Sequence, residues 1–512
     1  MIKQRLLTWC LAAVLLLSAC GGGLPGPDRP AVSLPEQPIS GLTPTTDKGL
    51  GLEPAGGAAA PTLDAAPGAP VSPTQPGALP TATRPTVTLP AFPLPGMELE
   101  SISQQALDLS IQAGAYWIRR NMLDWSLVEP VEGQRDWSAL TGLETEMQRV
   151  AQAGGQLVLV VRGAPDWAQE KTGVWCGPIM GEKLPAFAAF LQEAVTRYSA
   201  APYNVKYWEI GNEPDIDPKL VDPKSPYGCM GNRKNEYYGG GEYAELLKAA
   251  YPAVKAANPQ AQVLVGGLLL DCDPVSPPEG SDCTPALYLE GALRAGAGDF
   301  FDGVSFHAYD RYLEAYKYHN PNWHAAWNSS GPALVPKTRY LRSVLNVYGY
   351  PQKYLLNTES GLICGQTGAE PYCQDDAFIL TKSYYLAHVN VAARAEGLRG
   401  NLWYSLSGWR GTGLLDSQGA PNRAYEAYKF TASMLQGVGF VREINDYPGV
   451  RVYELANSER IVWFLITADG LEHTLLLPTQ PTDAYDVFGA AVPAEGTQIP
   501  IGWAPLFLEF AP

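Results

Sequence analysis

Two glutamates that close apolar segments are the side chains of this sequence best placed to do chemistry. Glu213 follows the run "VKYWEIGN", and Glu359 follows "KYLLNT". Runs of this composition predict buried strands, so each strand finishes by presenting a carboxylate. Two carboxyl groups facing each other across a cleft can break a glycosidic bond. One donates a proton to the leaving oxygen, and the other attacks the anomeric carbon or activates a water molecule.

Such a pair requires that two strands 359 − 213 = 146 residues apart in sequence end at the same place. A lone glutamate at a strand end is more often ion-paired or a helix cap. Whether these two glutamates form a catalytic pair therefore depends on the fold that positions them. Seven apolar, strand-like runs alternate with helix-forming stretches along most of the chain. They are "AYWIRRNML", "QLVLVVRG", "VKYWEIGNE", "QVLVGGLLL", "FDGVSFHAY", "KYLLNTESG" and "GNLWYSLSG".

A less clear eighth run, near "GMELESI", precedes these seven. Near-continuous apolar strands that alternate with helices are typical of a parallel sheet covered by helices. Eight such units predict a (β/α)8 TIM barrel, a fold of the α/β class. Functional groups of this fold lie at the C-terminal ends of the strands, so Glu213 and Glu359 are expected to face one mouth. No GxGxxG motif follows an early strand, which disfavours a nucleotide-binding sheet.

The chain is predicted to divide into four segments. After the barrel, short runs such as "GVRVYELA" and "RIVWFLITA" follow one another without helical stretches, which indicates a small β-sandwich-like domain. The segments are a signal peptide (1–19), a disordered tether (20–95), the barrel (96–436) and the all-β domain (437–512).

The N-terminal segment "MIKQRLLTWCLAAVLLLSAC" has basic residues, a short apolar run and then small residues, which is typical of a secretory signal. Its end, "LSAC", resembles a bacterial lipobox. The resemblance implies lipid on Cys20 and an exported protein anchored to the outer face of the bacterial cell membrane. The alternative is an ordinary signal peptide with a chance cysteine. Residues 21–91 lack Phe, Trp and Tyr and hold 15 of the 45 prolines, which predicts a disordered tether.

The composition restricts the partners of the folded part. The formal net charge is −16, and the sequence lacks a basic run after its first residues, which argues against nucleic acid or an anionic membrane surface as a partner. Contact with a membrane is expected only through the lipid anchor. The hydrophobic fraction of 46% and aromatic fraction of 10% supply ample material for a large core.

The segments around the two glutamates resemble those of glycoside hydrolase clan A, the retaining TIM-barrel glycosidases, and look nearest to families 39 and 5. "GNEPD" resembles the end of the fourth strand, where Asn212 precedes an acid/base at Glu213. "NTESG" resembles the end of the seventh strand, where Glu359 is the nucleophile. The resemblance covers most of the barrel. It implies an enzyme that hydrolyses O-glycosidic bonds of a poly- or oligosaccharide by double displacement, with no cofactor and no metal.

Further segments extend the resemblance and imply the residues that bind substrate. "RRNMLDWSLVEPVEGQRDW" implies Arg120 near the nucleophile, and "APDWA" implies Trp167 at the mouth. "SFHAYD" implies that His307 and Tyr309 face inward, and "NLWYSLSGW" implies Trp403 under the sugar ring. For His307, a structural role is an equally good interpretation, and any single tryptophan can instead belong to the core.

The roles implied for these groups define their expected surroundings. The acid Glu213 needs a raised pKa, which an apolar wall and the charge of Glu359 would supply. Arg120 would favour the ionised form of Glu359, and Tyr309 would hold its side chain by a hydrogen bond. Asn212 would bind the sugar 2-hydroxyl group.

The cysteines predict disulfide bonds. Six remain besides Cys10 and Cys20, an even number in an exported protein, and fifteen pairings are possible. Placement in loops after the third, fourth, fifth and seventh strands narrows these to three expected pairs on the catalytic face: Cys176–Cys229, Cys272–Cys283 and Cys364–Cys373. A zinc site is the competing interpretation, but there is no CxxC spacing to support it.

Two other functions remain open for this sequence. The chain could be a surface lipoprotein that binds glycans without cleaving them, using the barrel as a scaffold. A serine esterase is a weaker alternative, because no GxSxG motif is present.

Overall fold

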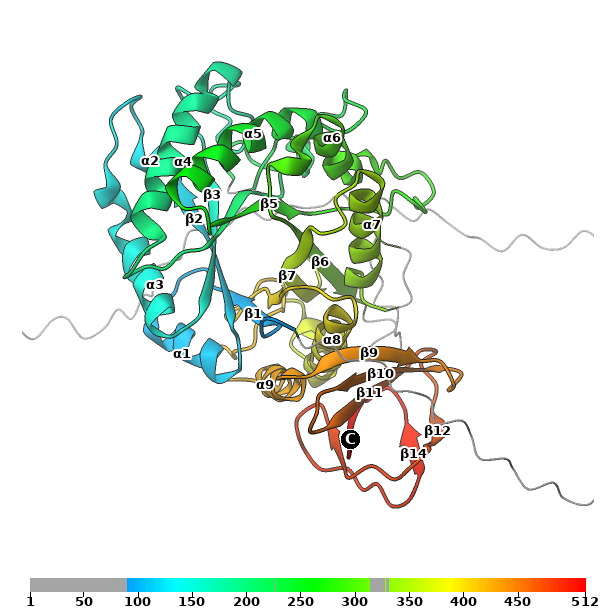
Figure 1. Cartoon of the computed structure of the whole chain (residues 1–512). Helices are drawn as coiled ribbons and strands as arrows, with labels where there is room; N and C mark the ends of the chain where they lie inside the picture. The colour runs from blue at the N-terminus through cyan, green and yellow to red at the C-terminus, as the bar shows by residue number, and fades with distance from the viewer. Residues whose placement is uncertain (1–89, 226, 314–326, 328–330) are drawn as a thin grey trace, which may run out of the picture. The chain divides into compact units, whose positions relative to one another are not determined.

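A computed structural model describes residues 90–512 of the chain, apart from 226, 314–326 and 328–330 (Figure 1). The predicted signal peptide, Cys20 and nearly all of the predicted tether lie outside the described residues. Leu94 and Pro95 were assigned to the tether, but both are buried, so the folded part begins slightly earlier than predicted. No helix in the described part of the chain is long and apolar enough to cross a membrane.

Eight parallel strands close into a barrel in sequence order, which confirms the predicted TIM barrel (Figure 1). The weakly predicted first strand is present, and it closes the ring by pairing with both the second and the eighth. The strands are β1 (Pro95–Glu98), β2 (Trp117–Asp124), β3 (Gln156–Arg162), β4 (Tyr207–Asn212), β5 (Gln262–Leu268), β6 (Gly303–Tyr312), β7 (Tyr354–Cys364) and β8 (Asn401–Trp403).

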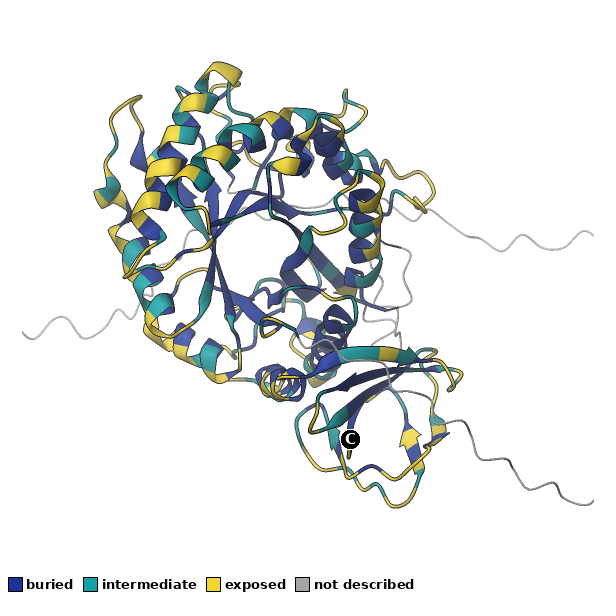
Figure 2. Ribbon diagram, viewed as in Figure 1, coloured by how far each residue is buried: buried dark blue, intermediate teal, exposed yellow. Residues whose placement is uncertain are grey.

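Helices cover the outside of the barrel, with their apolar faces turned to the strands. In α3, Leu143, Met147 and Val150 are buried at helical spacing, and Figure 2 shows the exposed side of the helix layer facing away from the strands. The helices are α1 (Gln104–Gln112), α2 (Trp125–Val128), α3 (Thr141–Gln152), α4 (Leu184–Tyr198), α5 (Gly240–Ala257), α6 (Tyr288–Arg294), α7 (Leu334–Val347), α8 (Asp376–Ala395) and α9 (Arg423–Leu435).

The barrel interior changes from apolar to charged along the strands. Near the strand starts, six residues form a separate buried cluster: Trp117, Val158, Tyr207, Leu264, Leu356 and Leu402. Side chains of a strand alternate between its two faces, so Arg119 and Glu209 lie on the same inner face as Trp117 and Tyr207, two residues further along. Both are fully buried. The apolar cluster therefore closes the floor beneath a charged layer.

The C-terminal part consists of antiparallel strands, as predicted. A five-stranded sheet has the order β13-β15-β11-β10-β9, and β12 pairs with β14. Residues such as Val452, Leu465 and Leu508 form a core cluster of their own. The strands are β9 (Gly439–Ile444), β10 (Val450–Ala456), β11 (Ile461–Thr467), β12 (His473–Leu476), β13 (Asp483–Asp486), β14 (Gln498–Ile501) and β15 (Leu506–Phe510).

The three expected disulfide bonds are confirmed. They join Cys176 to Cys229, Cys272 to Cys283 and Cys364 to Cys373. All six cysteines lie at or beyond the C-terminal ends of strands, in the loops that lead to the next helix. The bonds therefore brace the face of the barrel that carries the strand-end residues.

We predict that the disulfide bonds stabilise the fold in the order of their loop lengths. The 53-residue separation of Cys176–Cys229 corresponds to about 4 kcal/mol from restricting the unfolded chain, and the 9-residue separation of Cys364–Cys373 to about 2.5 kcal/mol. Double Cys→Ala variants compared by urea unfolding should follow this order. A larger loss for the 364–373 pair would contradict it.

Candidate active site

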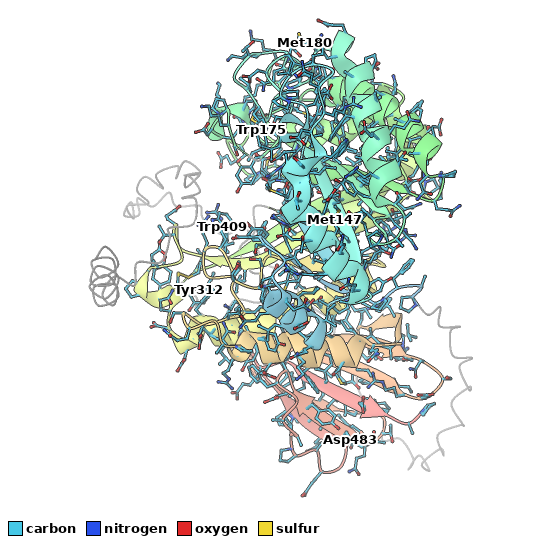
Figure 3. The ribbon with its side chains drawn as sticks, turned by 90° about the vertical axis from the view of Figure 1, so that its left-hand side faces the viewer. Met147, Trp175, Met180, Tyr312, Trp409 and Asp483 are labelled. Carbon is cyan, nitrogen blue, oxygen red and sulfur yellow. A yellow bond between two sulfur atoms is a disulfide. The ribbon has the colours of Figure 1, made fainter. Side chains whose placement is uncertain are left out.

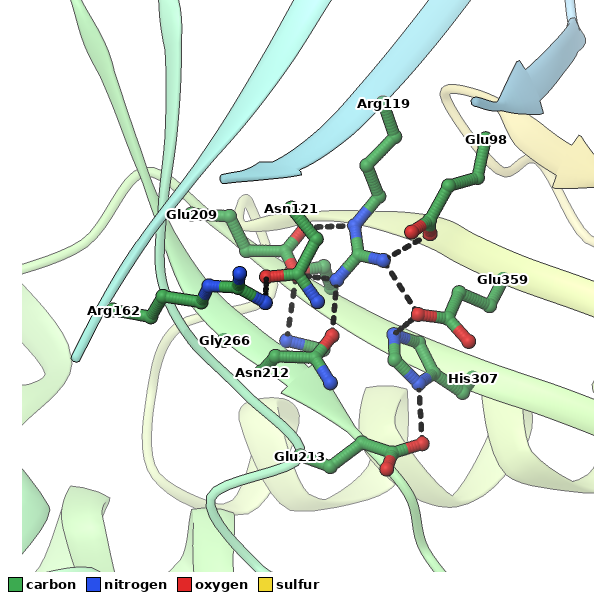
Figure 4. A network of polar contacts seen from close by, with 12 residues as sticks. Glu98, Arg119, Asn121, Arg162, Glu209, Asn212, Glu213, Gly266, His307 and Glu359 are labelled. Carbon is green, nitrogen blue, oxygen red and sulfur yellow. Dashed lines mark hydrogen bonds and ion pairs between the residues drawn. The ribbon is translucent and has the colours of Figure 1, made fainter. Parts of the chain in front are cut away.

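The guanidinium of Arg119 is the centre of the charged layer inside the barrel (Figure 4). Its Nη2 donates to Glu209 at 2.6 Å and to Asn212 at 2.5 Å, while Nη1 donates to Glu359 at 2.5 Å and also to Glu98. Burial alone lowers the pKa of Arg119, but the three carboxylates raise it well above its ordinary value. Arg119 is therefore a permanent cation that ties β1, β2, β4 and β7 together.

The prediction of Arg120 beside the nucleophile is wrong by one residue. Arg120 lies on the outer face of β2, where its Nε donates to Glu146 of α3 at 2.6 Å. Adjacent residues of a strand point to opposite faces, so only one of the two arginines can enter the barrel. The residue that contacts Glu359 is Arg119.

Glu213 and Glu359 meet at the mouth of the barrel, with His307 between them (Figure 4). Nδ1 of His307 is 2.8 Å from Oε1 of Glu213, and Nε2 is 3.5 Å from Oε1 of Glu359. One oxygen from each carboxylate and a nitrogen of the imidazole all lie within 4.8 Å of one another. The two strand ends thus bring the two carboxyl groups to one small volume.

Glycines and a residue with a left-handed backbone conformation shape the chain at the ends of β4 and β5. Glu213 itself has a left-handed φ of 49°, after Gly211 at 90°, so the chain turns sharply where β4 ends. A Cβ on Gly267 of β5 would lie 2.1 Å from Nε2 of His307. Glycine at 267 is what allows the imidazole to reach between the glutamates.

Glu359 is held at both of its oxygens. Oε1 accepts from Arg119, and Oε2 accepts from the hydroxyl group of Tyr309 at 2.5 Å, the hydrogen bond expected from the sequence. These donors fix the rotamer and stabilise the carboxylate anion. Asn212 presents its amide oxygen to Arg119, and its amide nitrogen is buried with no partner in the described structure.

The two glutamates differ in their proton affinity. Burial, followed by the charge of Asp215, raises the pKa of Glu213 to about 8. Asp215 is the main carboxylate that raises it, while the repulsion between the two glutamates contributes to a raised pKa of Glu359. Burial also raises the pKa of Glu359, but Arg119 and Tyr309 oppose the rise. The value of about 8 makes Glu213 the member of the pair that holds a proton near neutral pH, whereas Arg119 and Tyr309 favour the anionic form of Glu359.

His307 and Lys337 complete the surroundings of Glu213. Burial, Arg119 and Lys337 lower the pKa of His307 well below its ordinary value, so the imidazole is neutral. Lys337 of α7 is buried, and its Nζ donates at 2.8 Å to the carbonyl oxygens of His307 and Leu269. Asp215 accepts from the backbone amides of Leu269 and Leu270 at 2.9 Å. These contacts bind the ends of β4, β5 and β6 to one another.

The prediction that Trp403 lies under a sugar is wrong. Its side chain is fully buried, its Nε1 donates to the carbonyl oxygen of Thr412 at 2.9 Å, and its ring packs near Tyr385 of α8. Trp403 pairs in register with Met97, the neighbour of the inward-facing Glu98, and therefore faces the helix layer. Its role is core packing.

Two rings beyond β8 lie beside Tyr309, the residue whose hydroxyl group contacts Glu359. Tyr404 and Trp409 each lie 6.2 Å, centroid to centroid, from Tyr309 and from each other. Tyr404 is buried and Trp409 is half-buried. In Figure 3, Trp409 lies on the same side of the ribbon as Tyr312, the last residue of β6, and Trp175, which follows β3. The sequence interpretation missed both residues, although both stand in the quoted motif "NLWYSLSGW".

Trp167 lies beyond β3, as expected, but its contacts are with the neighbouring loop. Its Nε1 donates to the carbonyl oxygen of Glu129 at 2.9 Å, its ring packs on Trp125, and Lys183 lies 5.5 Å above it. Trp167 therefore belongs to a cluster of rings on the β2 and β3 loops. The described contacts do not join it to Glu213 or Glu359.

The Glu213–His307–Glu359 group has donor atoms near enough together for a metal ion. Both oxygens of Glu359 already accept hydrogen bonds, and one of those donors is the permanent cation Arg119. A cation bound there would be repelled by the guanidinium. The arrangement fits proton transfer and nucleophilic attack better than metal binding.

Solved structures with this fold include several glycoside hydrolases. A family 39 glycoside hydrolase from Bacteroides cellulosilyticus WH2 has a TM-score of 0.60 and 20% identity, over 81% of this chain and 80% of that one. A GH30 endoxylanase from Clostridium papyrosolvens C71 has a TM-score of 0.56 and 12% identity, over 83% and 98%.

A monomeric β-xylosidase from Caulobacter crescentus CB15 has a TM-score of 0.51 and 15% identity, over 83% of this chain and 98% of that one. No family profile matches the sequence, and no curated protein matches it. At such low identities the likeness establishes the shared fold. The resemblance to clan A glycosidases that the strand motifs suggested is thus confirmed as a resemblance of fold.

We predict that Glu213 makes the stability of the protein depend on pH. Its pKa is about 8 in the folded state against an ordinary value of 4.5, so the folded protein holds this proton more tightly than the unfolded chain. The contribution is fully present below pH 4.5 and is lost as the pH rises through 8. Thermal unfolding of Glu213→Gln and the parent should therefore diverge between these values, with the variant relatively more stable at high pH. Parallel curves would contradict the prediction.

Proposed function

We propose that the protein is a retaining glycoside hydrolase that cleaves O-glycosidic bonds of a poly- or oligosaccharide, with Glu213 as acid/base and Glu359 as nucleophile. The observation that carries the proposal is the pairing of the two glutamates at one barrel mouth, within 4.8 Å and with unequal proton affinities. Fold likeness to glycoside hydrolases is additional support.

The first step is attack by the carboxylate of Glu359 on the anomeric carbon while Glu213 gives its proton to the leaving oxygen. Arg119 and Tyr309 hold the attacking carboxylate in one position. The unpartnered amide nitrogen of Asn212 is free to donate to the sugar 2-hydroxyl group, a bond that strengthens in the transition state.

The second step is hydrolysis of the glycosyl–Glu359 ester by a water molecule. Glu213 has lost its proton in the first step and now removes one from the water. His307, at 2.8 Å from Glu213, keeps that side chain oriented through both steps. Once Glu359 is esterified it is no longer charged, so less repulsion acts on the Glu213 anion.

The separation of the carboxyl groups favours retention of configuration. Retaining enzymes place the two groups roughly 5–5.5 Å apart, whereas inverting enzymes leave roughly 6.5–9.5 Å for a water molecule. One oxygen of Glu213 and one oxygen of Glu359 lie within 4.8 Å of each other, and this close approach is in keeping with the shorter separation. A non-catalytic glycan-binding protein is the second candidate function, but such a protein has no need of a proton-holding acid beside an anion.

We further propose that the protein acts outside the cell. Three disulfide bonds are typical of proteins in an oxidising compartment, and the fold is shared with a conserved exported protein from Bacteroides fragilis, at 12% identity and a TM-score of 0.56. The lipobox-like "LSAC" would attach lipid to Cys20 and tether the enzyme to the outer face of the membrane.

Replacement of each glutamate by alanine is predicted to reduce the hydrolytic activity in a different way. Glu359→Ala should abolish hydrolysis of aryl glycosides and regain activity with azide, because azide can enter the space of the lost nucleophile. Glu213→Ala should lose roughly 10²–10⁴-fold on substrates with poor leaving groups and much less on activated aryl glycosides. A panel of nitrophenyl glycosides and glycan fragments, with product stereochemistry followed by NMR, measures both. Binding of glycans without any turnover by the parent would favour the non-catalytic function.

Trp409, not Trp403, is predicted to serve as the sugar platform. Trp409→Ala should raise KM about fivefold, the loss of one aromatic contact of ~1 kcal/mol, with little change in unfolding. Trp403→Ala is the matched control and should cost about 3–5 kcal/mol of stability, because it empties a buried ring site. An unchanged KM in Trp409→Ala would show that this ring does not contact substrate.

A further inference from the structure

A second cavity lies at the opposite end of the barrel from the glutamates. Its volume is about 570 Å³. It is bounded by the segment that enters β1 (90–95), the loops before β2 and β3, and the ends of α8 and α9. A volume of this size is typical of pockets for small organic molecules. The proposed reaction takes place at the other ends of these strands and makes no use of this cavity.

Arg394 of α8 lines this cavity and is buried without a partner. Only 6% of the residue is exposed, and its Nε is buried with no hydrogen bond. Across the described ranges, its guanidinium forms neither a hydrogen bond nor an ion pair. Burial lowers its pKa to about 10, with no carboxylate to oppose the effect. The contrast with Arg119, which has three carboxylate partners, is sharp.

The charges around the cavity have one sign. Lys429 of α9 is its second cation, and the lining residues within the described part of the chain include no aspartate or glutamate. This is unusual on a chain with a formal net charge of −16. The remaining lining is mainly apolar or backbone and includes Phe92, Leu94 and Leu435.

We infer that this cavity, here named the base pocket, binds a small organic anion through Arg394 and Lys429. A guanidinium offers a planar fork that matches a carboxylate or a phosphate group, so an anion would provide the partner that Arg394 lacks. The apolar lining suits a compact body attached to that charged group, and Lys429 adds a second attraction at the exposed side. A free carboxylic acid and a phosphate ester share this chemistry.

A purely structural account of Arg394 is less complete. Several helices end near the base pocket, and a cation can stabilise the carbonyl groups of helix C-termini. The last carbonyl groups of α9, however, accept from Arg460, whose Nη2 contacts Ser433 and Met434. Arg394 makes no such bond within the described structure, so the helix ends do not account for its burial.

The base pocket is tested by calorimetric titration of the full chain with glucuronate, inorganic phosphate and glucose at constant ionic strength. Glucose is the neutral match for glucuronate. We expect saturable binding of glucuronate or phosphate that is stronger than binding of glucose. Arg394→Gln should weaken it at least tenfold. Whichever anion binds more tightly identifies the carboxylate or the phosphate source.

The control variant is Arg442→Gln, which removes an arginine that is 57% exposed on β9 and should leave binding unchanged. Thermal unfolding without ligand gives a second readout. Because a buried charge without a partner is unfavourable, Arg394→Gln should unfold at an equal or higher temperature than the parent. Binding of neither anion, binding that survives Arg394→Gln, or a marked loss of stability in that variant would each overturn the inference.

Discussion

A single buried guanidinium determines how the catalytic end of the barrel is built. A cation in the dry interior is tolerated only where anions and hydrogen-bond acceptors surround it, and Arg119 has Glu98, Glu209, Glu359 and Asn212 around it. Glu98 and Glu209 hold the guanidinium, so its remaining donors reach the two residues at the mouth. Glu359, the proposed nucleophile, is thereby fixed before any substrate arrives, which is the preorganisation that electrostatic catalysis requires.

The same charge distribution separates the two glutamates. Three carboxylates share one guanidinium, so the layer already carries excess negative charge, and a further anion at Glu213 would be costly. Glu213 contacts His307, a neutral imidazole, and it lies near Asp215. It therefore holds a proton near neutral pH, while Arg119 and Tyr309 favour the ionised form of Glu359. Two identical side chains are thereby suited to the proposed roles of acid and nucleophile, because only one of them contacts the guanidinium directly.

The sequence was sufficient for the barrel, the paired glutamates and the disulfide bonds, because these depend on periodicity and on the order of strands and loops. The sequence interpretation failed where the function of a side chain depends on which of two adjacent strand residues faces the barrel interior. "WIRRN" offers two adjacent arginines, and only the alternation from the inward-facing Trp117 selects Arg119. Glu209 could have identified the inward-facing arginine. It is a carboxylate within an apolar run, and a buried carboxylate requires a buried cation as its partner. The alternation of side chains along the short β8 likewise points Trp403 toward the helices. Trp409, beyond the end of β8, lies near the mouth instead.

The two ends of the barrel each contain a buried arginine, and a buried cation needs an anionic partner. At the strand ends, the partners of Arg119 come from the chain itself, and the resulting network is rigid and complete. At the strand starts, Arg394 is also buried, beside a cavity, but the described chain supplies no anion. An unpaired buried charge lowers stability, and a structural role would be served as well by an apolar side chain of similar size. A cation kept under that cost is explained most simply by a partner that comes from solution.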